Sequence, residues 1–434
     1  MTTPIQGQGD FNLFALELLT KDSIFDLREV FVEINLFEDL FAPSLSGDVT
    51  VDDARNLTYY GPILGGEILN IGINTPTLQN ESEGIQTELE VYSMPHKAFV
   101  KDRVQQFVIS GSSPVAIQNM RSRVNKSFED THANIIQEIF EEYLNIDNIE
   151  TLDIEQDKYK EKVIIPNWRP LNAIQWLAGR SVSGSDATDY LFYQTRDGFQ
   201  FKSLSSLLSA PKTATISLEK GGLQKFNEQP INRITVAGFE KVFNRMDDLK
   251  KGMFGSTLVT YDQTRKKIEK TVFDYVDEWN NRSHAEKQKT VYDEQPDSSE
   301  SQLFYKSKRQ HLYGAGQSDE EHDDNVKEYF QRRNSFIQDQ NRYRFVVTIT
   351  GNANIKLGDI IKLDIPSPEM VIDSVDNQLD GHLSGRWLVT SIRHKITRSE
   401  HMMTLDLMKD SFKEKLLVGG RPTISTGTEA GTFF

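Results

Sequence analysis

The chain has 434 residues, no cysteine and a formal net charge of −15. This length predicts two to four domains, and the lack of cysteine excludes disulfides, thiolate nucleophiles and cysteine-based zinc sites. The acidic balance argues against a general nucleic-acid binder, which needs a basic surface to neutralise phosphates. No apolar run approaches the roughly 20 residues of a membrane-spanning helix, and the opening sequence MTTPIQGQGD lacks the features of a secretory signal.

The first part of the chain predicts a β-module. Apolar and polar residues alternate from Val30 to Phe37, as in a half-buried strand. LSGDV follows, and we expect a turn at Gly47. GGEILNIGINTP at 65–76 combines a Gly-acidic turn, alternating apolar residues and a closing proline, and the segments ELEVYSM and VQQFVISG are predicted to form a hairpin.

Helices are predicted in the next hundred residues. In DTHANIIQEIFEEYLN, apolar residues recur with helical spacing and Thr131 is a suitable N-cap. NWRPLNAIQWLAGR predicts a second helix with Pro170 in its first turn and an end at Gly179 or Gly184. A hairpin on RDG follows, so we expect a small α/β domain at 114–213.

A second insertion, at 243–341, is polar and rich in charge, and it is predicted to end on the helix NVKEYFQRRNSFIQDQ. One side of that helix would carry Val326, Tyr329, Phe330 and either Phe336 or Ile337. The Gly/Thr-rich residues 413–434 have no periodic apolar face and are predicted to form an extended C-terminal arm.

Two stretches of the first module return near the end of the chain. GGEILNIGINTP at 65–76 matches LGDIIKLDIPSP at 357–368 with an offset of 292, and VYSMPHK at 91–97 matches VTSIRHK at 389–395 with an offset of 298. The two matches are collinear, which indicates an internal duplication of an antiparallel β-module. The alternative is two unrelated β-domains whose strands converge.

These patterns predict an α+β, mainly β protein with two duplicated antiparallel β-modules, which the resemblance described below implies are tube-like barrels. The expected domains are β-module 1 at 1–113, the α/β insert at 114–213, a split β-module 2 at 214–242 and 342–412, the polar insertion at 243–341, and the arm at 413–434.

The order of these parts resembles the central hub protein of the baseplate in contractile-tailed bacteriophages. The resemblance is carried by GNANIKLGDIIKLDIP with WLVTSIRHKITRSEHMMTLDLM, by GGEILNIGI with EVYSMPHK, and by IPNWRPLNAIQWLAGRSVSGSDATDYLFYQTRDGFQF. It covers residues 25 to 412, and the insertion at 243–341 is its least recognisable part.

The resemblance implies a homotrimer in which each subunit carries two tail-tube-like barrels. Three chains would then offer six near-equivalent faces to a hexameric tail tube, and a trimeric central spike, which in some members bears a lysozyme, would bind at the other end. The protein would lie in the virion tail baseplate, assemble in the host cytoplasm, contact other baseplate proteins and let DNA pass without specific binding. It would need no cofactor and no membrane anchor.

Enzyme and metal sites have weak signals. Glu138, Glu141 and Glu142 are candidate acids for a glycosidase, although a solvated helix face is expected. DEEHDDN at 319–325 lacks the glycine and the closing glutamate of a calcium loop. We therefore predict no catalytic, cofactor or metal residues and no enzyme activity.

His96 and His394 recur in the duplication, which favours a shared structural role, and His394 and His401 lie seven residues apart across a predicted turn, a spacing that does not indicate metal ligands by itself. Trp168 and Trp176 are expected to pack in a core or interface. The alternative functions are a tail-associated cell-wall hydrolase, which needs an acid pair in a cleft, and a glycan- or receptor-binding tail protein, which needs exposed aromatic rings.

Overall fold

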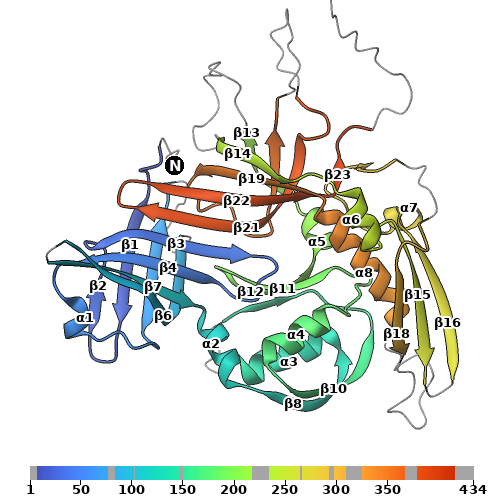
Figure 1. Cartoon of the computed structure of the whole chain (residues 1–434), viewed down its shortest axis with the longest axis horizontal. Coiled ribbons are helices and arrows are strands. Elements are labelled where there is room, and N and C mark those ends of the chain that lie inside the picture. Colours follow the sequence, from blue (N-terminus) through green and yellow to red (C-terminus); the bar gives the residue numbers. More distant parts are fainter. Residues whose placement is uncertain are drawn as a thin grey trace, which may run out of the picture.

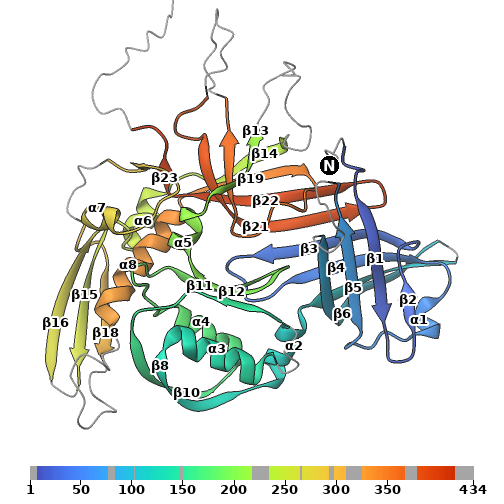
Figure 2. The same ribbon diagram turned by 180° about the vertical axis from the view of Figure 1, so that it is seen from behind.

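The computed structural model describes residues 7–76, 84–101, 103–145, 150–217, 234–263, 266–292, 298–308, 325–366 and 379–415. Strands dominate these residues, in one 13-stranded sheet and four smaller sheets. Helices cluster in the two insertions (Figures 1 and 2). The predicted mainly β, α+β class is confirmed.

The first strand set forms one half of the large sheet. Its hydrogen-bonded order is β3 (Phe31–Asp39), β4 (Ser46–Asp53), β7 (Val104–Ser112), β6 (Ile85–Lys101), β5 (Ile68–Asn74) and β1 (Asn12–Leu19). The short β2 (Ile24–Asp26) extends this half beyond β1, and α1 (Leu57–Tyr60) lies between β4 and β5. Gly47 lies within β4, so the predicted turn at this residue is wrong. A Cβ at this position would clash with Asn35 and Leu36 of the neighbouring β3, which explains why the strand has a glycine here.

The second strand set repeats this order. It consists of β14 (Ile234–Lys241), β19 (Tyr343–Thr350), β22 (His401–Lys409), β21 (Gly385–Thr397), β20 (Ile360–Asp364) and β13 (Lys212–Ser217). Two groups of six strands, far apart in the chain, thus follow the same hydrogen-bonded order, which a chance match of two short strands would not produce.

The pairing register repeats as well as the order. In the first set Val49 of β4 pairs with Ile109 of β7, and in the second Val347 of β19 pairs with Leu405 of β22. These partners correspond at constant offsets of 298 and 296 along both ladders. A one-residue slip would turn every side chain to the other face, so the shared register confirms the predicted duplication.

The Gly-acidic turn is reproduced in detail. Gly66 donates a backbone hydrogen bond to Val91 at 2.8 Å, and Gly358 donates the equivalent bond to Val389 at 3.0 Å. Both glycines have positive φ, +95° and +84°, a conformation that other residues adopt only with strain. The glycine in each sequence match is therefore required by the turn that starts the strand.

The duplication is not perfect. Both long strands carry a β-bulge at the same place, 91–93 and 389–391, but β6 has a second bulge at 93–96 and a third at 99–101. The extra residue shifts β6 by one position relative to its neighbour, so His96 and His394 are not structurally equivalent although their sequences align. The prediction that the two segments lie on corresponding strands is confirmed, and their last residues are out of register.

The two sets merge instead of forming separate closed barrels. The hydrogen-bonded path runs openly from β14 to β2, because β21 of the second set pairs with β3 of the first. A further difference is that β13 pairs with β20 in parallel, whereas β1 pairs with β5 antiparallel. β13 follows directly after α5 (Leu204–Ser209) of the α/β insert, so the chain enters β13 at the end of the sheet opposite to the one at which it enters β1.

The α/β insert has its own core. Its elements are α2 (Pro114–Arg121), β8 (Val124–Thr131), α3 (His132–Tyr143), β9 (Leu152–Ile154), β10 (Lys160–Trp168), α4 (Pro170–Ala178), β11 (Tyr190–Thr195), β12 (Gly198–Ser203) and α5 (Leu204–Ser209). The side chain of Thr131 caps α3 as predicted, Pro170 starts α4 and Gly179 ends it. Both predicted helices bury their apolar stripes in this core.

The second insertion is more structured than its polar sequence indicates. It contains α6 (Arg245–Lys250), β15 (Gly255–Asp262), β16 (Lys267–Asp274), α7 (Tyr275–Glu278), the 3-10 helix η3 (Trp279–Asn281), β17 (Gln288–Lys289), β18 (Leu303–Lys308) and α8 (Val326–Gln340). The closing helix is confirmed as α8, which buries Val326, Tyr329 and Phe336. β17 pairs with β23 (Ser411–Phe412) just before the predicted arm, whose residues from 416 onward lie outside the described ones. The proposed division of the chain into domains is still a prediction.

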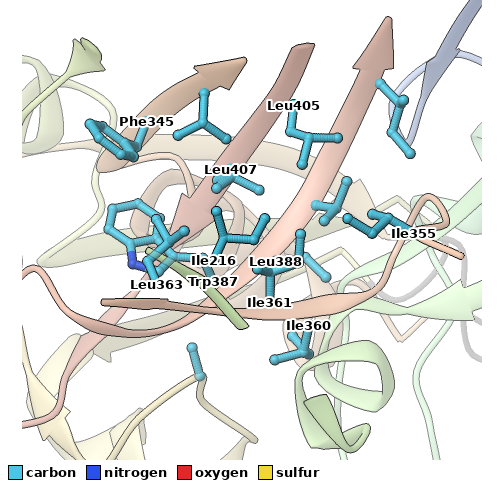
Figure 3. Close-up of a cluster of buried hydrophobic side chains, with 14 of the residues drawn as sticks. Ile216, Phe345, Ile355, Ile360, Ile361, Leu363, Trp387, Leu388, Leu405 and Leu407 are labelled. Carbon is cyan, nitrogen blue, oxygen red and sulfur yellow. The ribbon is translucent and has the colours of Figure 1, made fainter. Parts of the chain in front are cut away.

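The core of the second strand set lies between β20, β21, β22 and the α/β insert (Figure 3). Leu363 and Ile361 of β20 lie beside Trp387 of β21, and Ile360 points away on the other side of the strand. All of these side chains are fully buried, because α5 and the insert cover the second face of β20. β20 is thus covered on both faces, although its sequence alternates between apolar and polar residues as in a strand with one solvated face.

Candidate functional site

The two strand sets meet along a seam, in which residues 33–39 of β3 pair antiparallel with residues 391–397 of β21. Arg393 reinforces the pairing by donating hydrogen bonds to the Asn35 side chain at 3.0 and 2.8 Å. The seam is a main-chain contact, so it depends on strand edges more than on particular side chains.

Each set also buries a side chain in the core of the other. Ile396 of β21 is fully buried in the core of the first set, together with Ala353. Leu40, which follows β3, is fully buried in the core of the second set. This exchange of apolar side chains makes the two sets one packed unit.

Two histidines that are seven residues apart in the sequence meet at the seam. His394 and His401 are buried, with His394 Nδ1 3.1 Å from His401 Nε2, while His394 Nε2 faces Glu38 of β3 at 3.6 Å. His394 presents one nitrogen to His401 and the other to Glu38, so the three side chains do not converge on one point as the ligands of a metal ion would. His394 makes a buried polar contact between the sets, and the predicted structural role shared with His96 is wrong, because His96 is exposed and one position out of register.

His401 gives the fold an expected pH dependence. Burial, reinforced by His394, lowers the pKa of His401 to about 3, whereas an unfolded histidine titrates near ~6.5. The unfolded chain binds the proton first, so the free energy of unfolding should fall as the pH decreases from about 6.5 towards 3. Urea unfolding at pH 7 and pH 5 measures this loss. His401→Asn should reduce the pH dependence; an unchanged pH dependence in this variant would contradict the assignment.

The strands equivalent to the seam strands have free edges. β21 uses one edge for both β20 and β3. On β6, residues 85–90 pair with β5, but the rest of that edge, 92–101, has no strand partner among the described residues. β14, the counterpart of β3, pairs only with β19 and ends the described sheet. Among the described residues, one copy of the contact is thus formed and the strands of the other copy have no partner along these edges.

These free edges expose apolar side chains. On β6, Tyr92 is 58% exposed and Phe99 is 74% exposed; on and after β14, Phe239 is 40% and Phe243 is 55% exposed. His96 is also exposed, in contrast to the buried His394. Unpaired strand edges with large apolar side chains are typical of protein interaction surfaces.

The predicted acidic candidates do not form a catalytic pair. Lys126 Nζ lies 2.6 Å from Glu138 and 2.9 Å from Glu142, and these carboxylates are 49% and 47% exposed. Gln137 donates to Glu141 on the same helix face. A general acid needs an apolar setting that raises its pKa, and these groups lie in a solvated ion-pair cluster.

A buried polar cluster that the sequence did not predict lies at the start of α3. His132 Nδ1 is 2.9 Å from Asp157, His132 Nε2 is 2.9 Å from Glu161, and Arg180 is 3.3 Å from Glu161. Burial alone would lower the pKa of His132, but the two carboxylates outweigh it and raise that pKa. Asp157 also accepts backbone hydrogen bonds at the first turn of α3, so the cluster closes this helix end. Asp157 and Glu161 lie 25 and 29 residues after His132 in the sequence, too far to form a local sequence motif with it.

A second buried cluster anchors the second insertion. Arg282 and Asp339 form an ion pair in which both side chains are fully buried, and Tyr275 donates its hydroxyl to Asp339 at 2.8 Å. Asp410, directly after β22, lies 2.8 Å from His284. Buried charges thus join α8 to the preceding part of the second insertion, and they join this insertion to the end of β22 in the large sheet.

The other features singled out in the sequence are the acidic and histidine residues that could bind a metal, any membrane-spanning helix, and the two tryptophans. Within the described residues, no three His, Asp or Glu side chains are placed to hold a metal ion. The acidic stretch 319–324 lies outside that part of the chain. No helix in the described ranges is long and apolar enough to cross a membrane. Trp168 and Trp176 contact each other edge to face at 5.5 Å and pack against the core of the α/β insert.

No family model matches this chain. A probable baseplate hub protein of Vibrio phage KVP40 is 24% identical over 290 residues, which are 62% of this chain and 64% of that protein. The chain thus spans less than two thirds of the length of this relative.

Two solved structures share the fold. The 43 kDa tail protein of prophage MuSo2 from Shewanella oneidensis has a TM-score of 0.55 and 11% identity, over 92% of this chain and 99% of that chain. A tail protein from Neisseria meningitidis MC58 has a TM-score of 0.53 and 10% identity, over 91% and 96%. The resemblance to phage baseplate hub proteins that the sequence predicted is confirmed by the Vibrio phage relative.

Proposed function

We propose that this protein is a structural, non-enzymatic hub of a phage tail baseplate. Three copies form a ring that joins a hexameric tail tube to a trimeric central spike, and the ring encloses a channel for DNA. The similarity to a baseplate hub protein supports this role. The protein is then a virion tail component that is assembled in the host cytoplasm.

The observation that carries the proposal is the repeated strand set. One chain presents the same order of six strands twice, and the register of the β4–β7 ladder recurs in the β19–β22 ladder. Three such chains provide six similar modules around an axis, which suits a tube of six subunits on one side and a spike of three on the other. A chain with a single module would match only one of these symmetries.

The purified protein is expected to be a trimer. Light scattering after size exclusion should give a mass near three times 49.6 kDa, and negative-stain images with purified tail-tube rings should show the trimer on one end of the tube. A monomer that degrades cell walls would instead favour the tail-associated hydrolase. A monomer that binds glycans would favour the receptor-binding alternative.

The isolated hub is expected not to bind duplex DNA near physiological salt. A lumen rich in Lys and Arg would retain DNA electrostatically, and this chain carries 64 acidic against 49 basic residues. We propose that the channel lining holds more Asp and Glu than Lys and Arg. Fluorescence anisotropy with a labelled duplex tests this; a micromolar complex at that salt would contradict it.

A further inference from the structure

We propose that copies of this chain join by pairing the free edge of β14 in one copy with the free edge of β6 in the next. This pairing would repeat between chains the contact that β3 and β21 make within the chain. The inference rests on the proposed function for the ring, and it adds the strands and residues that hold the ring together.

The counterpart of each β3 residue follows from the ladders. Asn35 of β3 pairs with Asp48 of β4, and Gly238 of β14 pairs with Val346 of β19. Because β4 and β19 correspond at an offset of 298, Gly238 takes the place of Asn35. Both β3 and β14 also have a bulge near their start, at 31–33 and 234–236, but β14 has a second bulge at 239–241 that β3 lacks. The edge of β14 therefore copies the edge that β3 presents to β21 as far as Phe239, which includes Gly238.

The counterpart of each β21 residue follows in the same way. Lys395 pairs with Met402 of β22, and Ala98 pairs with Gln106 of β7, strands that correspond at an offset of 296. Ala98 thus takes the place of Lys395 once the extra bulge of β6 is included. Since Asn35 and Lys395 are direct partners in the seam, the partners predicted between chains are Gly238 and Ala98.

The chemistry of these edges fits a second copy of the chain. Each edge presents unpaired backbone groups that another strand can satisfy, beside exposed apolar rings such as Phe99 and Phe239. Pro95 lies in the second bulge of β6 and removes one donor from its edge. The proline leaves a short pairing segment after the bulge, and this limits the unspecific strand addition that a long, flat edge would invite.

The geometry favours a closed ring. The contact joins two different surfaces, so it is heterologous and adds copies in one rotational direction. Seams within chains would alternate with seams between chains. If each seam turns the next strand set by the same angle, three copies with two sets each close after six steps and leave no seam edge free.

A disulfide tests the register, because the chain has no native cysteine. Ala98→Cys together with Gly238→Cys places one thiol on each edge, and a Cβ at Gly238 meets no atom within 4 Å. Directly opposed residues in an antiparallel ladder have Cα atoms about 4.5–5.5 Å apart, within the range of a disulfide. Mild oxidation should convert most of the chain to a covalent trimer on a non-reducing gel, and a reducing agent should restore the monomer band.

Two matched controls define the result. His96→Cys with Gly238→Cys moves one thiol two residues along the same face, because 96–99 pair regularly with β7. The two thiols then face each other across a diagonal of about 7–8 Å and should give at least about tenfold less trimer. Asn35→Cys with Lys395→Cys should form a disulfide within one chain. This disulfide is seen as a loss of free thiols, while the protein still runs as a monomer on the non-reducing gel. A trimer by light scattering whose Ala98–Gly238 pair does not crosslink, or crosslinks no better than the shifted pair, overturns the edge pairing and leaves the hub function standing. A monomeric wild-type protein overturns the proposed function itself.

Discussion

Replacing Arg282 with methionine is expected to destabilise the protein by ~3–5 kcal/mol, because it leaves the carboxylate of Asp339 buried without its counter-ion. Both side chains of this pair are fully buried, and Tyr275 supplies only one further hydrogen bond. Urea unfolding followed by tryptophan fluorescence measures the loss, since Arg282 lies 5.6 Å from the ring of Trp279.

Two variants separate the charge effect from lost packing. Arg332→Met breaks the more exposed pair with Glu278 and should cost no more than ~1 kcal/mol. The double variant Arg282→Met/Asp339→Leu removes both buried charges and should recover much of the stability, because an apolar pair of similar volume costs no desolvation of ions. A single Arg282 variant as stable as the Arg332 variant would contradict the assignment.

Leu363→Ala is expected to cost ~2–5 kcal/mol, the range for truncating a fully buried leucine in a packed core. Leu363 is inaccessible to solvent and lies beside Trp387 in the core of the second strand set (Figure 3). The neighbouring Lys362 points to the other side of β20 and is half-buried, so Lys362→Ala is the matched control and should cost less than ~1 kcal/mol. A measured loss below ~0.5 kcal/mol for Leu363→Ala would place this residue outside the core.

The sequence reveals the duplication because two local requirements leave a clear pattern. The turn before β5 and β20 needs a glycine with positive φ, and the strands that follow alternate apolar residues. Helices α3 and α4 are equally readable, since Thr131 and Pro170 mark their first turns. Such features depend on neighbours within a few residues, and a single sequence displays them.

The seam could not be predicted from the sequence alone. β3 and β21 read as ordinary alternating strands, and nothing local indicates that each has a second neighbour from the other set. The second bulge in β6 is equally silent, so aligned sequences suggested that His96 and His394 are equivalent when they are not. The polar residues that α8 buries, such as Asp339, also belong to a pattern that normally indicates solvent. Pairings between distant segments decide all of these features.

The seam joins one strand that is translated early with another that is translated near the end of the chain. Asp39 pairs with Ser391, so 352 further residues must be translated before its partner exists. At the ~5–20 residues per second of a ribosome, this takes roughly 20–70 s. During that interval the first strand set has no cover on its β3 edge, and Leu40 has no core to enter. A crowded polysome therefore holds many nascent chains with the same open edge, and truncated products that end before residue 385 should be the species that most needs a chaperone.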